Sequence, residues 1–453
     1  MKTSYASVFE FGYLCADEEQ IQQGYTYIPD SDFADLERRC LTDDNSGFSQ
    51  IMQPRIKQGC HVLQVQNYVG VIFVPSGRHI EVLPKTGIAE WDDANHSSNI
   101  VVRKTARKSL LMMLQSLREF RHIALDSSDI ETLHLPLLEI FIARFLDSVN
   151  TVRKRGLRSD YVEQQENLLA KRGKLNVSMQ IKHNFVHKQR FYCEFDEYLQ
   201  NRPANRLIKS ALLKVQRYCH QQRNQRLLNE LLFYFDEIPV STNIEADFSQ
   251  LNLIRGMNYY QAALAWTRLI LHDQSPVSMK GQSNAPSLLF PMESVFEAYV
   301  AQQLRTILPA PYSLRTQSRA ETLAEHQGEG MFTLQPDMII EHRELRLAVL
   351  DTKWKRINAY SRKDKYGLYQ GDFYQMFAYG HKYLSGKGTL ALIYPKTQDF
   401  REPIEHCFDF DKNGRLILWL IPFTVSVKDE VTKDELHHHE VSYLLKKLET
   451  SSH

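Results

Sequence analysis

Two short apolar runs, each beside an acidic residue, constrain the fold of this chain more than any other feature. Pro336-Asp337 precedes Met338-Ile339-Ile340, and the run from Leu345 to Leu350 precedes Asp351-Thr352-Lys353. Both runs have the length of a buried strand, and the polar residues 341–344 between them have the length of a hairpin loop. Because side chains alternate along a strand, Asp351 and Lys353 leave the same face. Folding the hairpin would bring Asp337 beside Asp351, so two carboxylates and one ammonium should meet at one end of a sheet.

These residue types suit the hydrolysis of a phosphodiester. Mg²⁺ is held by hard oxygen ligands such as Asp carboxylates, together with several waters. The metal polarises a phosphoryl oxygen and lowers the pKa of a bound water, and a nearby lysine can orient that water and stabilise developing charge. A strand end that carries a surface ion pair would show the same D…DxK pattern. The hairpin alone therefore leaves both interpretations open.

A predicted helix lies upstream of the hairpin, over residues 292–304. Its apolar residues recur at intervals of three and four, and Glu293 and Glu297 lie one turn apart at the border of the apolar face. A carboxylate in that position could point into a metal site. Two solvated acids near a helix N-terminus, where they favour the helix dipole, are the alternative.

A second predicted helix follows the hairpin, over residues 372–379, with Asp372 placed to cap it. Gln375 and Tyr379 are four residues apart and so share one face. Taken alone, Tyr379 is more often a half-buried aromatic than a functional residue. Together with the preceding elements, however, this helix completes an ordered set of four.

The order of a Glu helix, a PD strand, a DxK strand and a Gln helix resembles the PD-(D/E)xK nuclease superfamily. More closely, the chain resembles the McrC family, the nuclease subunits of McrBC-type methylation-dependent restriction systems. This closer resemblance covers roughly residues 60–400, and the first sixty residues have no match. The stretches that carry it are 67–72 with 80–85, 172–175, 195–197, 203–209 and 370–383.

The resemblance implies a Mg²⁺-dependent DNA endonuclease and assigns a role to each site residue. Asp337, Asp351 and Glu297 would hold the metal, and the choice of Glu297 over Glu293 rests on the resemblance alone. Lys353 would position and activate the attacking water. Gln375 and Tyr379 would orient Lys353 or a phosphate.

A partner is implied as well. The chain has no G-x-x-x-x-G-K-[ST] loop, and so no recognisable site for nucleotide hydrolysis. In the family, the partner is an AAA+ GTPase resembling McrB, which uses the GTP, reads methylcytosine and receives the N-terminal region in its ring. The chain would then cleave double-stranded DNA as the endonuclease subunit of a 5-methylcytosine-dependent restriction complex. The alternatives are a non-catalytic adaptor that binds and stimulates the GTPase ring, against which the intact acids and lysine argue, and a stand-alone nuclease.

Charge points to DNA only locally, because the formal net charge is +1. Basic residues gather in several clusters, and the cluster that follows the DxK strand is the best candidate for phosphate contacts. For any single cluster, a solvated charged loop remains the default interpretation. The candidate DNA contacts are Lys355, Arg356, Arg362, Lys363 and Lys365.

A length of 453 residues with 43% hydrophobic content predicts a globular protein of two or three domains. We expect a multi-domain α+β and α/β fold. Residues 1–150 would form a mixed, hairpin-containing region that docks the partner, and residues 151–285 a mainly helical middle, ending in a linker over 273–286. Residues 286–453 would form the PD-(D/E)xK endonuclease domain, a mixed sheet flanked by helices, with a C-terminal helical tail. Scattered cysteines without a CxxC pair, and the lack of a signal or membrane-length apolar run, predict a cytoplasmic protein with no membrane association.

Overall fold

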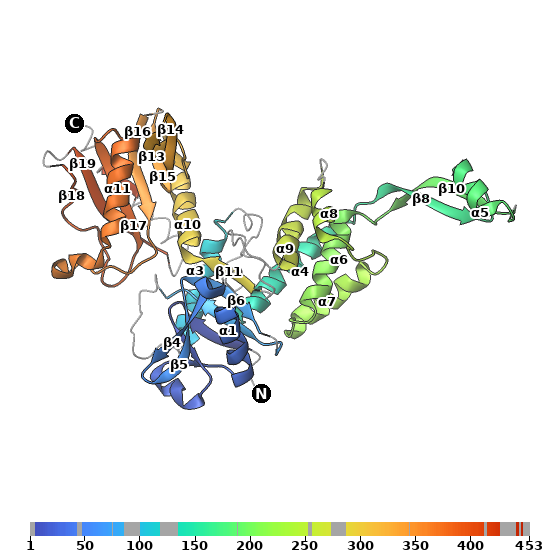
Figure 1. The fold of residues 1–453 in the computed structure, drawn as a ribbon, viewed down its shortest axis with the longest axis horizontal. Coiled ribbons are helices and arrows are strands. Elements are labelled where there is room, and N and C mark those ends of the chain that lie inside the picture. The colour runs from blue at the N-terminus through green and yellow to red at the C-terminus, as the bar shows by residue number, and fades with distance from the viewer. Residues whose placement is uncertain are drawn as a thin grey trace. The chain divides into compact units, whose positions relative to one another are not determined.

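The computed structural model forms two compact units, one of residues 1–137 with 274–453 and one of residues 138–273 (Figure 1). The sequence predicted three parts. In the structure, the first and the last of them belong to the same compact unit. The residues that the structure describes are 5–42, 48–74, 76–85, 100–117, 135–187, 189–251, 256–272, 287–343, 345–411, 415–425, 441–443 and 445–446. The predicted linker and most of the predicted C-terminal tail lie outside them.

A four-stranded sheet near the N-terminus has the order β1-β7-β6-β11. It consists of β1 (Tyr5–Phe9), β7 (His79–Leu83), β6 (Tyr68–Phe73) and β11 (Ser287–Pro291). Strands β6 and β7 form the predicted antiparallel hairpin, and β1 pairs in parallel with β7. Gly70 of β6 has a φ of 131°, and a Cβ there would lie 2.0 Å from the carbonyl oxygen of Leu288. Only glycine therefore lets β11 approach this closely.

A second four-stranded sheet, of order β3-β2-β5-β4, shares an apolar core with the first. Its strands are β2 (Tyr13–Cys15), β3 (Thr26–Tyr27), β4 (Met52–Lys57) and β5 (Cys60–Val65). The helices between them in the chain are η1 (Glu18–Gln23), α1 (Asp30–Thr42) and α2 (Phe48–Ile51). Helix α3 (Ile100–Leu114) packs Val102 and Ala106 against Phe9 and Leu83.

The C-terminal part is built on a six-stranded mixed sheet of order β12-β15-β16-β17-β19-β18. Its strands are β12 (Tyr312–Thr316), β15 (Met338–His342), β16 (Leu345–Thr352), β17 (Gly388–Pro395), β18 (Phe408–Asp409) and β19 (Leu416–Phe423), with a separate hairpin of β13 (Glu321–His326) and β14 (Glu329–Leu334). Helix α11 (Gln370–Tyr383) packs Met376 and Tyr383 on the face that carries Leu418 and Leu420. Helix α10 (Met292–Ile307) contacts the other face, where its Tyr299 meets Phe423. The sheet is therefore covered on both sides.

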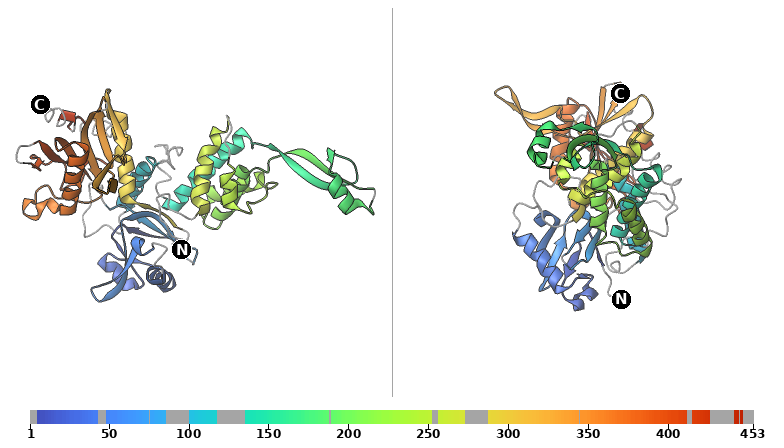
Figure 2. Two further views of the ribbon diagram at one scale, coloured as in Figure 1. Left: turned by 45° about the horizontal axis from the view of Figure 1, so that its top comes forward. Right: turned by 90° about the vertical axis from the view of Figure 1, so that its right-hand side faces the viewer.

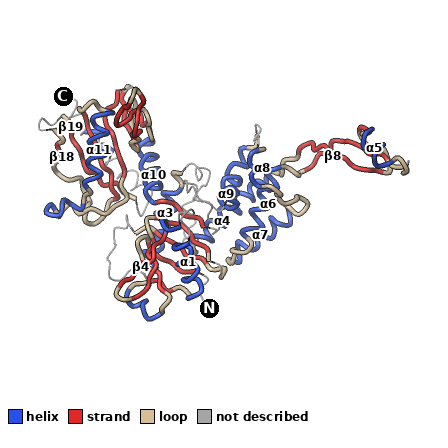
Figure 3. Tube along the Cα trace, viewed as in Figure 1, coloured by secondary structure: helices blue, strands red, loops and turns tan. Residues whose placement is uncertain are grey.

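The second unit combines helices with a two-stranded ribbon (Figure 3). The helices are α4 (Leu137–Arg155), α6 (Pro203–Val215), α7 (Gln222–Tyr234), α8 (Ile244–Ser249), η4 (Asn258–Tyr260) and α9 (Gln261–His272). The ribbon pairs β8 (Asp160–Leu168) with β10 (Phe191–Leu199) and carries β9 (Lys174–Leu175) and α5 (Val177–Asn184). The left view in Figure 2 shows it extending from the helices of its own unit. The sequence predicted the helices but missed the ribbon.

Buried polar side chains hold the helices of this second unit together. The Asn205 amide donates to the carbonyl oxygens of Arg158 (3.1 Å) and Gln200 (2.8 Å) and accepts from the Tyr260 hydroxyl (2.9 Å). Arg206 donates through two nitrogens to both carboxylate oxygens of Asp247. Residues 203–209, singled out in the sequence, thus have a structural role here.

No helix in the described part of the chain is long and apolar enough to cross a membrane.

Candidate functional site

Asp337 and Asp351 meet at the end of the β15–β16 pair. The strands are antiparallel with Met338 opposite Leu350, which places Asp337 beside the end of β16. One oxygen of Asp337, Oδ2, accepts hydrogen bonds from the Thr352 backbone N–H (2.7 Å) and hydroxyl (2.6 Å). The predicted hairpin is present, although β15 continues to His342 and leaves a loop shorter than the predicted 341–344.

Lys353 follows β16 and lies against Asp351. Its backbone N–H donates to the Ile393 carbonyl oxygen at 2.9 Å, which continues the pairing with β17. Its ammonium lies 2.5 Å from Oδ2 of Asp351, a side chain that is only 2% exposed. Beyond this contact with Lys353, no described residue donates a hydrogen bond to the Asp351 carboxylate. Asp351 therefore retains acceptor capacity, as a metal ligand requires.

Gln375 and Tyr379 of α11 fix the position of the ammonium. The Lys353 ammonium donates to Oε1 of Gln375 at 3.0 Å, and Nε2 of Gln375 donates to the Tyr379 hydroxyl at 2.8 Å. The Tyr379 hydroxyl donates in turn to the Gln335 carbonyl oxygen at 3.0 Å. This chain of hydrogen bonds ends two residues before Asp337, so it connects the lysine to the first acid as well.

Glu297 of α10 belongs to the same electrostatic cluster, and Glu293 is exposed. Oε1 of Glu297 accepts a hydrogen bond from the Gln317 side chain at 3.1 Å. Burial, followed by the charge of Asp337, raises the pKa of Glu297 to about 7. Burial and then Asp337 likewise raise the pKa of Asp351 to about 7.

Burial also raises the pKa of Asp337, against the hydrogen bonds from Thr352. For Lys353, burial disfavours the ammonium, but the nearby acids, Asp351 first, outweigh it and raise the pKa above its ordinary value. Glu297, Asp337 and Asp351 thus share a desolvated site beside Lys353, and burial, the largest cause for each acid, keeps all three pKa values raised.

Such a donor set fits Mg²⁺. Among the described residues, no group of three or more His, Cys, Asp or Glu side chains could by itself hold a metal ion. Mg²⁺ rarely uses an all-protein cage and usually keeps several waters while binding one or two carboxylates. Hard oxygen donors and a surplus of buried negative charge are therefore suitable for this ion.

The five candidate DNA contacts are all exposed and lie on the segment between β16 and α11. Lys355 lies 3.4 Å from Asp372 and 5.2 Å from the centre of the Tyr369 ring. Arg356 lies 3.5 Å from Asp399. Arg362, Lys363 and Lys365 belong to the short helix η5 (Arg362–Gly367).

Asp372 was predicted to cap its helix, and this is wrong. The cap position is Tyr369, and Asp372 lies in the first turn, buried, with its carboxylate 3.9 Å from the Lys353 ammonium and 3.4 Å from that of Lys355. The sequence reasoning also missed Thr352, which fixes Asp337. Its position in the sequence, between Asp351 and Lys353, could have identified it.

A buried contact joins the N-terminal sheet to this site. The Trp354 indole N–H donates to both carboxylate oxygens of Glu10 at 2.9 Å, and Glu10 also accepts from the Lys85 backbone N–H. Trp354 directly follows Lys353 and packs against Phe296, the neighbour of Glu297. The first sixty residues, unmatched in the sequence, thus contribute to the surroundings of the lysine.

A family model described as "McrBC 5-methylcytosine restriction system component" matches residues 63–395. The chain belongs to this family. The matched range contains every site residue named above except Glu10, and it extends through the helical unit.

A solved structure agrees at the level of the fold. A chain of the "refined half-complex from tetradecameric assembly of Thermococcus gammatolerans McrB AAA+ hexamers with bound McrC" is similar over 97% of this chain and 100% of that chain, with 16% identity and a TM-score of 0.67. A chain of the Thermococcus gammatolerans McrBC complex aligns over 67% of this chain and 88% of that chain, with 19% identity and a TM-score of 0.47. A comparison with curated proteins finds no match.

Proposed function

We propose that this McrBC-family chain is the Mg²⁺-dependent DNA endonuclease subunit of a 5-methylcytosine-dependent restriction complex. The observation that carries the proposal is that Asp337, just before β15, and Asp351 of β16 lie beside Lys353, with Glu297 of α10 in electrostatic contact with both aspartates. The mixed sheet, covered by α10 and α11 on opposite faces, supports the further proposal that it is a PD-(D/E)xK core.

Each side chain then has a role. Asp337, Asp351 and Glu297 would hold the metal, which when bound would polarise a phosphoryl oxygen and lower the pKa of water. Thr352 engages one oxygen of Asp337 and so fixes the direction of the other. Lys353 would orient the attacking water and stabilise charge on the phosphate, while Gln375 and Tyr379 hold its ammonium in place.

We further propose that the chain acts on double-stranded DNA together with an AAA+ GTPase resembling McrB. Membership of the McrBC family supports this, as does the lack of a nucleotide-hydrolysing loop in this chain. GTP would be used by the partner. The N-terminal region and the helical unit would serve as the adaptor, and the basic segment from Lys355 to Lys365 would contact phosphates.

The deciding experiment combines the purified chain with its AAA+ GTPase partner, GTP and Mg²⁺ and measures cleavage of methylated and unmethylated plasmid DNA. We expect methylation-dependent cutting that is lost in Lys353→Ala and Glu297→Gln. Glu293→Gln is the matched control, because Glu293 lies one turn away on the same helix and is exposed. GTP hydrolysis should persist in all variants. Stimulated hydrolysis by the wild-type chain without any cutting would favour the non-catalytic adaptor.

A further inference from the structure

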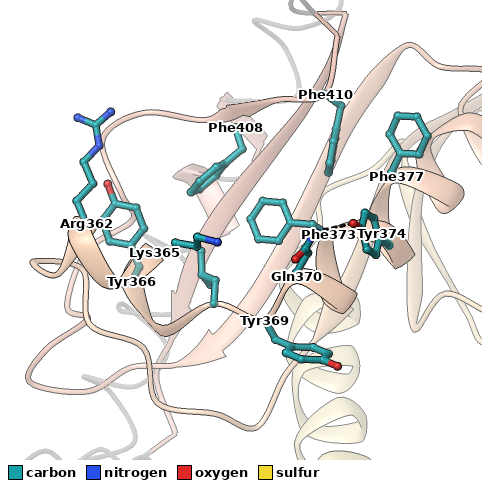
Figure 4. A pocket seen from close by; sticks show the side chains of 11 residues that line it. Arg362, Lys365, Tyr366, Tyr369, Gln370, Phe373, Tyr374, Phe377, Phe408 and Phe410 are labelled. Carbon is teal, nitrogen blue, oxygen red and sulfur yellow. Dashed lines mark hydrogen bonds between the residues drawn. The ribbon is translucent and has the colours of Figure 1, made fainter.

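An aromatic pocket lies beside the proposed site, on the outward side of α11. It has a volume of about 710 Å³, and most of its wall is formed by seven aromatic rings (Figure 4). These are Tyr366, Tyr369, Phe373, Tyr374, Phe377, Phe408 and Phe410. Residues 370, 373, 374 and 377 recur at helical spacing and so share one face of α11, turned away from Gln375 and Tyr379.

The phenylalanines form a fixed wall. The Phe373 ring meets that of Phe408 edge-on, with centroids 5.2 Å apart, and the Phe377 ring meets that of Phe410 at 5.6 Å. Phe373, Phe408 and Phe410 also pack against the core of the sheet. The outer rings stay open, since Tyr374 is 66% and Phe377 43% exposed. The Phe377 ring also meets that of His381 at 4.3 Å, so it is exposed only in part. A preformed wall with exposed rings is suited to stacking a flat ligand.

Charge identifies the kind of ligand. Arg362 and Lys365 line the pocket from the loop before α11. The segment from Lys353 to Gln370 has six basic residues and one acid. Cations combined with open aromatic faces are the combination that binds single-stranded nucleic acid, where cations follow the backbone and bases stack on rings. An apolar protein segment would not need this excess of positive charge.

A series of side-chain contacts connects the pocket to the proposed cutting site. Asp372 lies 3.9 Å from the Lys353 ammonium and 3.4 Å from that of Lys355, which in turn lies 5.2 Å from the centre of the Tyr369 ring in the pocket wall. A strand held at Lys353 can therefore continue along Lys355 and Tyr369 into the pocket.

We propose that this pocket binds unpaired bases of the DNA strand that runs past Lys353, by stacking on Tyr374 and Phe377 with phosphates on Arg362 and Lys365. The inference rests on the proposed nuclease function and specifies its substrate. The protein would hold a locally opened strand or a DNA end beside the cutting site.

The test is fluorescence anisotropy with the full-length chain and Ca²⁺ in place of Mg²⁺, so that binding is measured without cutting. The probes are a blunt duplex, the same duplex with a short single-stranded tail, and a tailed duplex whose tail is abasic. Tyr374→Ala and Phe377→Ala should each weaken binding of the tailed duplex by about fivefold to 150-fold, the range that stacking of one base supplies. Blunt-duplex binding should not change. The abasic tail should add less affinity than the tail with bases, because only its phosphates can bind, and neither substitution should weaken its binding.

Phe233→Ala is the matched control, because Phe233 is an 85% exposed phenylalanine on α7, in the other unit. It should bind every probe like the wild type. Asp351→Asn separates the two proposals. If the nuclease proposal fails, this variant cuts DNA like the wild type. The preference of the chain for the tailed duplex is measured separately and does not depend on that outcome. Wild-type affinity of both pocket variants for the tailed duplex would overturn the inference. Loss of binding to the GTPase partner with DNA binding intact would also overturn it and mark a protein-docking surface.

Discussion

Two buried aspartates in different units of the chain have opposite electrostatic surroundings. Asp247 of the helical unit accepts hydrogen bonds from the Arg206 guanidinium, and although burial raises its pKa, the hydrogen bonds and charge of Arg206 outweigh this and lower it. Asp351 has a single lysine, and burial and Asp337 raise its pKa to about 7. A structural acid is thus paired with a guanidinium, whereas the lysine beside Asp351 does not overcome the effect of burial on its pKa. The difference supports the proposal that Asp351 is a functional residue.

The largest expected effects come from replacing each of these two aspartates in turn. Asp351→Ala should lower the cleavage rate by at least about 10³-fold, because a ligand of the metal is worth several kcal/mol in the transition state. Asp247→Ala should instead lower the free energy of unfolding by about 2 kcal/mol, because it leaves the Arg206 guanidinium unpaired. Cleavage assays and urea unfolding of both variants check this. Retained cutting by Asp351→Ala would reject the assignment.

A smaller effect on the cleavage rate is expected for the residues that only position Lys353. Gln375→Ala removes the acceptor of the Lys353 ammonium and should reduce cleavage by about 10- to 100-fold, as loss of an orienting partner in a metal site does. Tyr379→Phe should act in the same direction. Lys382→Ala, an exposed change on the same helix, is the control and should cut normally. Equal rates for Gln375→Ala and the control would show that the hydrogen-bond chain is dispensable.

The raised pKa values predict how stability depends on pH. Without metal, folded Glu297 and Asp351 bind protons up to about pH 7, whereas the unfolded chain releases them near pH 4. The free energy of unfolding should therefore fall as pH rises through this window, by on the order of 1–3 kcal/mol. Mg²⁺ should restore stability at high pH, and its affinity should weaken below pH 7 as protons compete.

Urea unfolding in EDTA across this pH range measures the effect, and Asp351→Asn should flatten the profile. Asp247→Asn should leave its slope in place, because the lowered pKa of Asp247 lies below this pH range. Stability that rises between about pH 4 and about pH 7, with the wild-type chain free of metal, would contradict the raised pKa values.

The smallest effect is expected for an exposed cation. Lys363→Ala should weaken binding to all DNA sequences alike and reduce the salt dependence by about one released counterion, as loss of one phosphate contact does. Anisotropy titrations at several salt concentrations measure it. An unchanged salt slope would remove Lys363 from the DNA contacts.

Local patterns in the sequence were enough to predict much of the C-terminal part. Strand length, side-chain alternation and helical spacing placed Asp337, Asp351 and Lys353 correctly beside one another, and Gln375 and Tyr379 on one helix face. These features succeed because each depends on residues close in the chain. The metal, the DNA contacts and the catalytic roles stay predictions.

Features that depend on distant pairing could not be predicted in this way. A half-buried strand would alternate apolar and polar residues, but β8 and β10 break this pattern with polar residues such as Gln164, Gln165 and Glu194. The ribbon forms because the two segments pair with each other. The Glu10–Trp354 contact joins residues at opposite ends of the sequence, and no spacing rule relates them. Asp372 was misplaced because its role depends on Lys353 and Lys355, which lie in another element.

The pairing of β6 with β11 has a consequence for synthesis of the chain. Strand β6 ends at Phe73, and its neighbour β11 begins at Ser287, after the whole helical unit. One edge of the first sheet thus stays open on the ribosome while that unit is made, and open edges readily pair with other chains. The same strand that closes this edge leads directly into α10, the helix of Glu297. A nascent product that stops short of β11 would carry an unpaired strand edge and would lack every residue of the proposed site.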